Sequence, residues 1–505
     1  MHFIDLSIFI FYLIFMLGVG FYFLRKNKSK EDYFVGGRSM SAGHIGLSVV
    51  ATDVGGGFSI GLGGLGFAMG LSGSWMLFTG LLGAWLSAVF LIPKVYPLAK
   101  KHNFLTFPQT LSFHYNKKVA LVAGIISFIG YVGFTSSQIL AGAKLASATF
   151  PVLTINNAAL LMGVIAVVYT VIGGIKAVIY TDTIQWLILM IGLIFIGLPI
   201  AFYEIGGWEG LQQAVPPEFL SLGNFRFIQL FNWLITIVPI WFVGMTLYQR
   251  IYACKDEQTA KKAWKIAGLF EWPVMAFMGV ALGLFARVAF EQGMFTELGY
   301  AANSQMDAEL GLPLLLRSIL PIGLMGLMMS AYFSAIMSTA DSCLMAASGN
   351  LITDVLDYFS PTKETHAIKK SQLITLAIGA VAIALATIMT SVLDLMLYSY
   401  AFMVSGLLIP VLGTLVYKNP HPNAALLSMI IGGTTTLVLI FADLKLPLSL
   451  DANFFGISLS FIPFLFTDLK LPLGLDANFF GISLSFITFL IVQNTTKTNA
   501  KRQTA

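Results

Sequence analysis

The sequence predicts an all-α polytopic membrane protein with about 13 transmembrane helices. Hydrophobic residues make up 57% of its 505 residues and charged residues only 10%, whereas about 25% of a soluble domain is charged. Apolar runs recur from Leu6 to Val492, and roughly 20 such residues cross a bilayer as one helix. We therefore expect a multi-pass protein whose surroundings are a lipid bilayer, with little room for a separate soluble domain and no nucleic-acid partner.

The apolar runs define the expected spans in chain order. The first run ends in RKNKSK without a small-residue cleavage site, so we expect a retained span rather than a signal peptide. Short polar loops separate the runs that follow. The predicted spans are 4–24, 44–71, 74–98, 119–149, 156–174, 178–203, 227–250, 262–290, 314–350, 371–391, 393–417, 423–442 and a last one ending near 492.

Lysine and arginine gather in alternate loops, which predicts the orientation. RKNKSK (25–30) and KDEQTAKKAWK (255–265) fall on one side, and the acidic loops YEIGGWEG (203–210) and EQGMFTEL (291–298) on the other. Because positive loops mark the cytoplasm, we expect an outside N-terminus, a cytoplasmic C-terminus and a location in the plasma (inner) membrane.

The C-terminal part contains a tandem duplication. Residues 443–466 recur as 468–491, with 21 of the 24 positions identical. The apolar run in each copy is short for a complete span. We expect one copy to cross the membrane and the other to lie at the interface, re-enter or be strained.

The stretch ATDVGGGFSIG (51–61) places an acid and three consecutive glycines inside an expected span. Backbone groups in lipid must be paired, so such a stretch unwinds only where protein or a wet cavity surrounds it. Unwinding frees carbonyl oxygens that suit Na⁺ and N–H groups that suit a solute. The alternative is close helix packing through small residues, which we favour for the following GLGGLG (61–66) but not for ATDVGGG.

Two further features point to a hard cation. Asp53, Asp182 and Asp341 lie inside apolar segments, where each costs roughly 2.5–3.5 kcal/mol, and such acids usually face a polar pathway. In SAIMSTADSCLMAASG (334–349), positions 335, 338, 339 and 342 share one helical face that is rich in hydroxyl groups. Oxygen ligands without soft donors favour a hard cation, although Ser and Thr can also bond back to their own helix.

Four motifs together resemble the sodium:solute symporter family. They are EDYFVGGRSMS (31–41), SVVATDVGGGF (48–58), GGIKAVIYTDTIQ (173–185) and AIMSTADS (335–342). ATD and IMST resemble the bacterial sodium/proline branch, and GGGF and STADS the choline transporter branch. The resemblance implies a transporter core of two inverted five-helix repeats, here 44–203 and 227–417. The remaining parts are 1–43 (first helix and cytoplasmic loop), 423–492 (C-terminal helices) and 493–505 (cytoplasmic tail).

The first span of each repeat should then be discontinuous, and Pro239 and Gly244 interrupt 227–250 as the glycines interrupt 44–71. The resemblance implies a sodium site between the broken helix and the serine helix, and a second cation site in some members. Asp341 stands where members with that second site often have a hydroxyl group, so it would strengthen the site or bind a proton. The implied sodium ligands are Ala51, Val54, Ala335, Ser338 and Thr339, and the implied second set is Asp182, Ser338, Asp341 and Ser342.

The sequence indicates the solute-binding residues less specifically than it indicates the sodium ligands. Gly55, Gly56, Phe58 and Trp241 are expected to line the central cavity, with Asp53 ordering the broken turn or assisting sodium binding indirectly. Phe58 replaces a glutamine of the sugar-transporting members, which argues against a hexose. Aromatic residues here would hold a quaternary ammonium or an apolar side chain. Lys144 is expected to snorkel toward the outer surface rather than to contact the solute, and Gln249 and Arg250 to anchor their helix at the cytoplasmic side or serve an inner gate.

The expected function is sodium-coupled import of a small organic solute by alternating access, with Na⁺ as the coupling ion. The solute would be an amino acid, a choline-like amine or a small carboxylate. A solute sensor on the same fold is the alternative. An enzyme is not expected, because the six histidines fall in loops or at span ends and form no HExxH or Cys/His motif. A channel is not expected either, because no carbonyl filter motif is visible. The sequence sets no oligomeric state.

Overall fold

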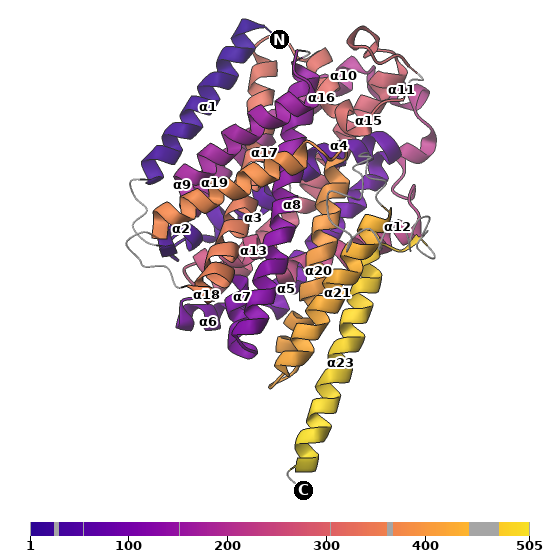
Figure 1. Ribbon diagram of the computed structural model, residues 1–505. Coiled ribbons are helices and arrows are strands. Elements are labelled where there is room, and N and C mark those ends of the chain that lie inside the picture. The colour runs from indigo at the N-terminus through magenta and orange to yellow at the C-terminus, as the bar shows by residue number, and fades with distance from the viewer. Residues whose placement is uncertain are drawn as a thin grey trace, which may run out of the picture.

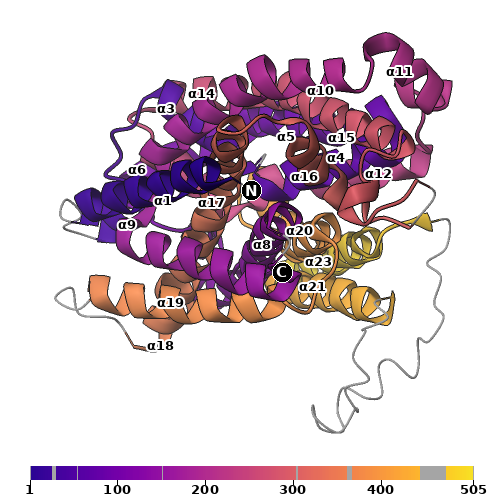
Figure 2. The ribbon, with the colours of Figure 1, turned by 90° about the horizontal axis from the view of Figure 1, so that it is seen from above.

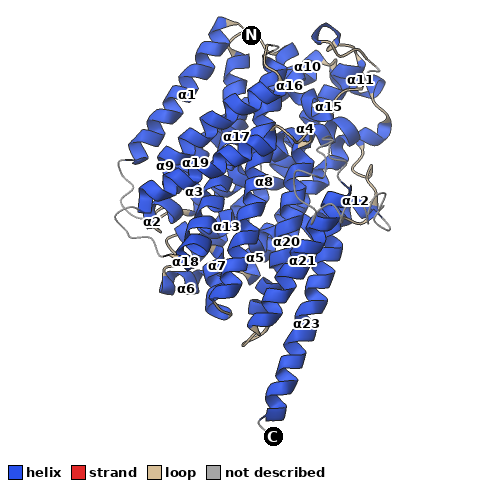
Figure 3. Cartoon of the chain, in the orientation of Figure 1, coloured by secondary structure: helices blue, strands red, loops and turns tan. Residues whose placement is uncertain are grey.

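The chain is a bundle of helices in the computed structural model, which describes residues 2–24, 30–53, 55–150, 152–302, 305–360, 367–443 and 474–503. These residues form helices and connecting loops and no strand (Figure 3). Helix α1 begins at one end of the bundle and α23 ends at the opposite one (Figure 1).

The first half of the bundle runs from α1 to α11 and contains the glycine-rich stretch. Its helices are α1 (Phe3–Leu24), α2 (Lys30–Val35), α3 (Ala42–Asp53), α4 (Gly56–Met69), α5 (Trp75–Phe90), α6 (Ile92–His102), α7 (Phe107–His114), α8 (Lys117–Thr149), α9 (Ile155–Gly192), α10 (Leu198–Glu204) and α11 (Gly207–Ala214).

The second half runs from α12 to α23 and contains the serine-rich helix. Its helices are α12 (Phe227–Val243), α13 (Met245–Ala253), α14 (Glu257–Leu269), α15 (Ala276–Glu291), α16 (Ala308–Ile319), α17 (Leu324–Gly349), α18 (Asp357–Phe359), α19 (Ala367–Ala386), α20 (Val392–Val416), α21 (Pro422–Asp443) and α23 (Ala477–Gln503), with π-helical turns η4 (Phe270–Met275) and η6 (Asn350–Leu356).

Within the described residues, 9 helices are long and apolar enough to cross a membrane, or 10 if a bent pair counts as one span. The all-α, multi-pass prediction is confirmed, while the number 13 stays a prediction. The expected span 314–350 divides into α16 and α17, because Pro321 has no N–H to continue the helix and Gly323 has a φ of 89°.

Helix α9 bends between two of the expected spans. The hydroxyl groups of Tyr169 and Thr181 are hydrogen-bonded at 2.9 Å, although these residues are 12 positions apart. In a straight helix they would be about 18 Å apart along the axis. The chain therefore bends sharply between them, which separates 156–174 from 178–203 as the sequence predicts.

Both expected discontinuities are present. Helix α3 ends at Asp53 and α4 begins at Gly56. Helix α12 ends at Val243 and α13 begins at Met245, and the two are bent by 42°. At the second break Gly244 is extended, with φ −70° and ψ 115°. A third interruption, which the sequence analysis did not mark, lies in η4, where Trp272 leaves the helical region.

Helix α17 lies in the interior of the bundle. Every residue from Met328 to Gly349 is buried, and α17 packs against α8 and α9. Seen from above, α17 and α8 lie between α19 on one side and α14 on the other (Figure 2). The serine-rich face is thus surrounded by protein and not by lipid.

The duplicated segment is described only in part. Residues 444–473, which contain almost all of the first copy, lie outside the described residues. Residues 477–491 of the second copy form the start of α23, which packs along α21 and α20. The predicted contrast between a crossing copy and a non-crossing one therefore remains a prediction.

Candidate sodium and solute site

The break between α3 and α4 lies directly against α17. Gly55 is in an extended conformation, with φ −66° and ψ −159°, and a Cβ at this position would overlap the side chain of Thr339. The backbone at the break can approach α17 this closely only because residue 55 is glycine. Val54, the other residue of the break, lies outside the described residues.

Oxygen atoms from the two helices meet at this contact. Thr339 Oγ1 donates to the backbone oxygen of Ala51 at 3.1 Å and lies 3.4 Å from that of Ala335. All three residues are at most 5% exposed. The structure therefore brings together three of the five residues expected to bind sodium.

Ser338, the fourth residue of that set, precedes Thr339 on the same helix. Its hydroxyl group is buried, and it interacts with the carboxyl group of Asp182. A hydroxyl oxygen keeps acceptor capacity when it donates, so Ser338 can also be a ligand of an ion. The four described residues fit Na⁺, because hard cations take oxygen ligands, backbone carbonyls included.

Two of the four residues of the second expected cation site contact a guanidinium group. Arg250 Nη2 donates to Asp182 Oδ2 at 3.0 Å and to Ser342 Oγ at 2.8 Å. Asp341 is directed elsewhere, since its Oδ1 accepts a hydrogen bond from Thr170 on α9. In this conformation the positive charge beside Asp182 is that of Arg250.

Arg250 connects three helices to α13. It is fully buried, and besides Asp182 on α9 and Ser342 on α17 it donates to the hydroxyl groups of Ser48 and Thr52 on α3. We call Ser48, Thr52, Asp182, Arg250 and Ser342 the Arg250 cluster. The sequence predicts Arg250 at the end of its span, as an anchor or part of an inner gate. The signal in the sequence for its burial is that this charge lies just six residues beyond the Gly244 break.

The residues expected to contact the solute lie in different places in the structure. Gly56 packs against Ile336 of α17, where a Cβ would overlap that side chain. Trp241 is fully buried against Gly83 of α5 and Trp264 of α14, and its indole N–H has no partner among the described residues. The side chain of Phe58 lies outside the described residues.

Asp53 ends α3 at the break and faces a second acid. Its Oδ1 accepts a hydrogen bond from the Tyr400 hydroxyl at 3.4 Å, and its carboxyl group interacts with that of Glu271 in η4. Glu271 is not among the site residues predicted from the sequence. The signal was present, because Glu271 is a single acid among apolar residues in the expected span 262–290.

Lys144 does not extend to the surface. Its side chain is 2% exposed, and its amino group lies 2.5 Å from Asp307 and 2.6 Å from Glu309. Glu309 also accepts the backbone N–H groups of Val392 and Leu393 at the start of α20. These bonds join α8, α16 and α20 into one unit.

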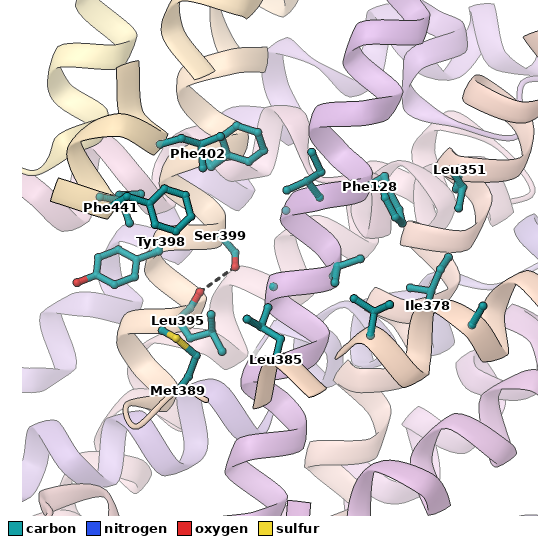
Figure 4. A pocket seen from close by; sticks show the side chains of 18 residues that line it. Phe128, Leu351, Ile378, Leu385, Met389, Leu395, Tyr398, Ser399, Phe402 and Phe441 are labelled. Carbon is teal, nitrogen blue, oxygen red and sulfur yellow. Dashed lines mark hydrogen bonds between the residues drawn. The ribbon is translucent and has the colours of Figure 1, made fainter. Parts of the chain in front are cut away.

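A cavity of about 540 Å³ lies between α8, α19, α20 and α21 (Figure 4). Its walls include Phe128, Phe402 and Phe441, and the hydroxyl group of Ser399 on its wall is bonded to the backbone oxygen of Leu395. Because these walls are apolar, the cavity does not provide the oxygen ligands that sodium needs.

Comparison with known proteins decides the family. Residues 33–432 match the sodium:solute symporter family. The chain belongs to this family. It is therefore a multi-pass membrane transporter that moves a small solute together with sodium, and it is not an enzyme.

Curated members of the family align along most of the chain. The sodium/proline symporter of Escherichia coli is 28% identical over 85% of this chain and 86% of its own length. The high-affinity proline transporter PutP of Bacillus subtilis is 26% identical over 84% and 89%, respectively. The sodium/glucose cotransporter of Vibrio parahaemolyticus is 27% identical over 88% and 86%.

Solved structures share the fold. A Na⁺-coupled sialic acid symporter, in its substrate-bound outward-open state, superposes with a TM-score of 0.76 over 98% of both chains at 19% identity. A nucleobase-cation-symport-1 family transporter, MHP1, superposes with a TM-score of 0.56 over 94% of this chain and 96% of its own, at 13% identity. These likenesses establish the transporter fold for this member of the sodium:solute symporter family.

Proposed function

We propose that the transported sodium ion binds between the α3–α4 break and α17. Its ligands are the backbone oxygens of Ala51, Val54 and Ala335 and the hydroxyl groups of Ser338 and Thr339. The observation that carries this proposal is the contact of Thr339 with both Ala51 and Gly55. An ion at this point joins the broken helix to α17, and therefore stabilises whichever conformation holds the two together.

The Arg250 cluster is the inner gate in this proposal. It fastens α13 to α3, α9 and α17, so its hydrogen bonds must break before these helices separate. When Arg250 withdraws, Asp182 and Ser342 lose their cation. Together with Ser338 and Asp341 they then form the second cation site, which receives sodium on its way to the cytoplasm.

The proposed orientation follows from the charged loops. The N-terminus is outside and the C-terminus is in the cytoplasm of a cell whose plasma (inner) membrane holds the protein. An inside-negative potential contributes roughly 2.3 kcal/mol per charge per 100 mV to import. The proposed solute is an amino acid, a choline-like amine or a small carboxylate, and the first of these is the solute type of the proline-transporting relatives.

Uptake into proteoliposomes tests the proposal. An imposed inward sodium gradient should drive accumulation of a labelled solute, and an equal potassium gradient should not. The Ser338→Ala variant should require more sodium for half-maximal uptake. Binding of solute without accumulation would instead identify a sensor. Unchanged sodium dependence in Ser338→Ala would reject the proposed ligand set.

A further inference from the structure

Three basic side chains converge on a small cavity at one end of the bundle. The cavity has a volume of about 120 Å³, and Arg38, Lys100 and Lys255 lie on its wall. They come from three separate segments, namely the loop before α3, the last turn of α6 and the loop between α13 and α14. Helix α6 lies at the end of the bundle opposite to the start of α1 (Figure 1). This is the cytoplasmic end in the proposed orientation.

The wall of this cavity contains no acidic residue among those described. Its other lining residues are Tyr96, Ala99 and Tyr252, which are at most 6% exposed. We call the six lining residues the basic pocket. Lys100 and Lys255 form no ion pair with any acid in the described part of the chain. The positive charge of the pocket is therefore not neutralised from within its own wall.

The acid that follows Lys255 in the chain is occupied elsewhere. Asp256 caps α14, and its carboxyl group accepts the backbone N–H of Thr259 at 2.7 Å. The hydrogen bonds from Thr259 lower the pKa of Asp256, and Lys255 and Lys100 lower it further. The two lysines thus make the electrostatic potential beside the pocket more positive.

Arg38 is fixed in position at the pocket. Its φ is 53°, a left-handed conformation that is uncommon for a residue with a Cβ and that clusters at ligand-binding sites. Its Nε donates to Glu31 at 2.6 Å and its Nη2 to the backbone oxygen of Phe104 at 2.7 Å. A guanidinium group has five N–H bonds, so N–H bonds remain for a ligand while the side chain is already held.

We propose that the basic pocket binds a phosphate group, carried either by a phospholipid head group or by a soluble phosphate compound. The guanidinium fork of Arg38 matches phosphate oxygens in pairs, and the lysines act as point charges. The volume fits, because a water molecule takes about 30 Å³ of liquid and a phosphate group is a few times larger. Basic pockets between helices at the cytoplasmic side are typical sites for anionic lipid head groups.

A phosphate group at this position would fasten the end of α13. The backbone N–H of Met40 donates to the oxygen of Ala253 at 3.0 Å, and that of Lys255 donates to the oxygen of Met40 at 3.3 Å. These bonds already join the loop that carries Arg38 to the end of α13. A phosphate group held by Arg38 and Lys255 adds a link across the same junction, and so favours the conformation that keeps the junction closed. No residue of the proposed sodium site lines the basic pocket.

Thermal unfolding of the purified, full-length protein tests the inference with two probes. The first is inorganic phosphate, titrated against chloride at constant ionic strength. The second is phosphatidylglycerol, added to the protein in neutral detergent and compared with phosphatidylcholine. We expect at least one of the two phosphate probes to raise the melting temperature. A response to phosphatidylglycerol alone assigns the group to a lipid, and a response to inorganic phosphate assigns it to a soluble compound or to both sources.

A double variant locates the binding. Lys100→Gln/Lys255→Gln removes two charges from the pocket, and both side chains are exposed, so the fold should persist. The variant should need about 10-fold or more of the effective probe for half-maximal stabilisation, because charge-assisted bonds are lost. Lys117→Gln/Lys118→Gln changes the net charge equally at the exposed start of α8, outside the pocket. This control should respond as the wild type does, which separates binding from the general effect of phosphate on protein stability.

The inference is overturned if neither probe stabilises the wild type beyond chloride and phosphatidylcholine. It is also overturned if the Lys100→Gln/Lys255→Gln variant responds at the same probe concentrations as the wild type, or if the control loses the response to the same extent. If the double variant does not unfold cooperatively, the single variant Lys255→Gln decides in the same way.

Discussion

Replacing Thr339 with valine removes one hydroxyl group from the contact between α17 and the α3–α4 break. The change leaves a side chain of the same shape, so the break keeps its neighbour. In the sodium-free protein the lost interaction is the 3.1 Å hydrogen bond to Ala51, worth about 1 kcal/mol. We therefore expect a modest decrease in stability and an intact fold.

The effect on sodium should be larger. An interaction between a polar group and a charge is worth about 1.5–3 kcal/mol, and each 1.4 kcal/mol is a factor of about ten in affinity. The sodium concentration for half-maximal stabilisation should therefore rise about 10- to 100-fold. The assay is thermal unfolding of the purified protein across a sodium titration, with potassium keeping ionic strength constant.

Thr375→Val is the matched control. Thr375 is also fully buried, and its hydroxyl group donates to the backbone oxygen of Ser371 at 2.8 Å within α19. This variant should lose a comparable amount of stability and keep its sodium response. If Thr339→Val titrates with sodium as the wild type does, the hydroxyl group is no ligand and the reasoning fails.

Gly55→Ala should strongly destabilise the protein, because its Cβ would overlap Thr339. The control Gly43→Ala has open space around its Cβ in α3 and should stabilise the protein by up to about 1 kcal/mol. Equal melting temperatures of the two variants would contradict the close contact of Gly55 with Thr339. Arg250→Gln should cost the closed inner gate about 3–5 kcal/mol by leaving Asp182 unpaired. In a Cys254→Ser background, Arg250→Gln should speed the labelling of the buried Cys343 by maleimide. An unchanged labelling rate would show that Arg250 does not hold the inner gate closed. Asp476 is exposed at the start of α23, but partial desolvation by the surrounding protein, together with Asp394, raises its pKa from 3.8 to about 6. The folded protein therefore retains a proton that the unfolded chain releases, so stability should fall as pH rises from about 4 to about 6. Asp476→Asn should flatten that slope in melting temperatures measured across this range, and an unchanged slope would assign it to another group.

The interruptions in the helices could be predicted from the sequence because their chemistry is local. Three consecutive glycines weaken any helix, and Gly55 and Gly244 both mark real breaks. The contact of α17 with the break was predictable from the hydroxyl stripe and the family resemblance together. The bend in α9 followed from the polar GGIK segment between two apolar runs.

The partners of the buried charges could not be predicted from the sequence in the same way. Arg250 stands near the end of an apolar run, where a charge usually marks the membrane surface. Its burial depends on Asp182, which lies 68 positions away in the sequence. Glu271 has the same character, since its partner Asp53 comes from the other repeat. Such pairs are formed by tertiary packing, and no local pattern specifies them.

The most direct test of the sodium site is equilibrium binding of radioactive sodium to the purified protein. The Ser338→Ala/Thr339→Val double variant removes both side-chain ligands and leaves the Arg250 cluster and Glu271 in place. We predict saturable sodium binding to the wild type and to Thr375→Val, and none to the double variant over the same concentrations. Wild-type sodium binding by the double variant would contradict a sodium site between the α3–α4 break and α17.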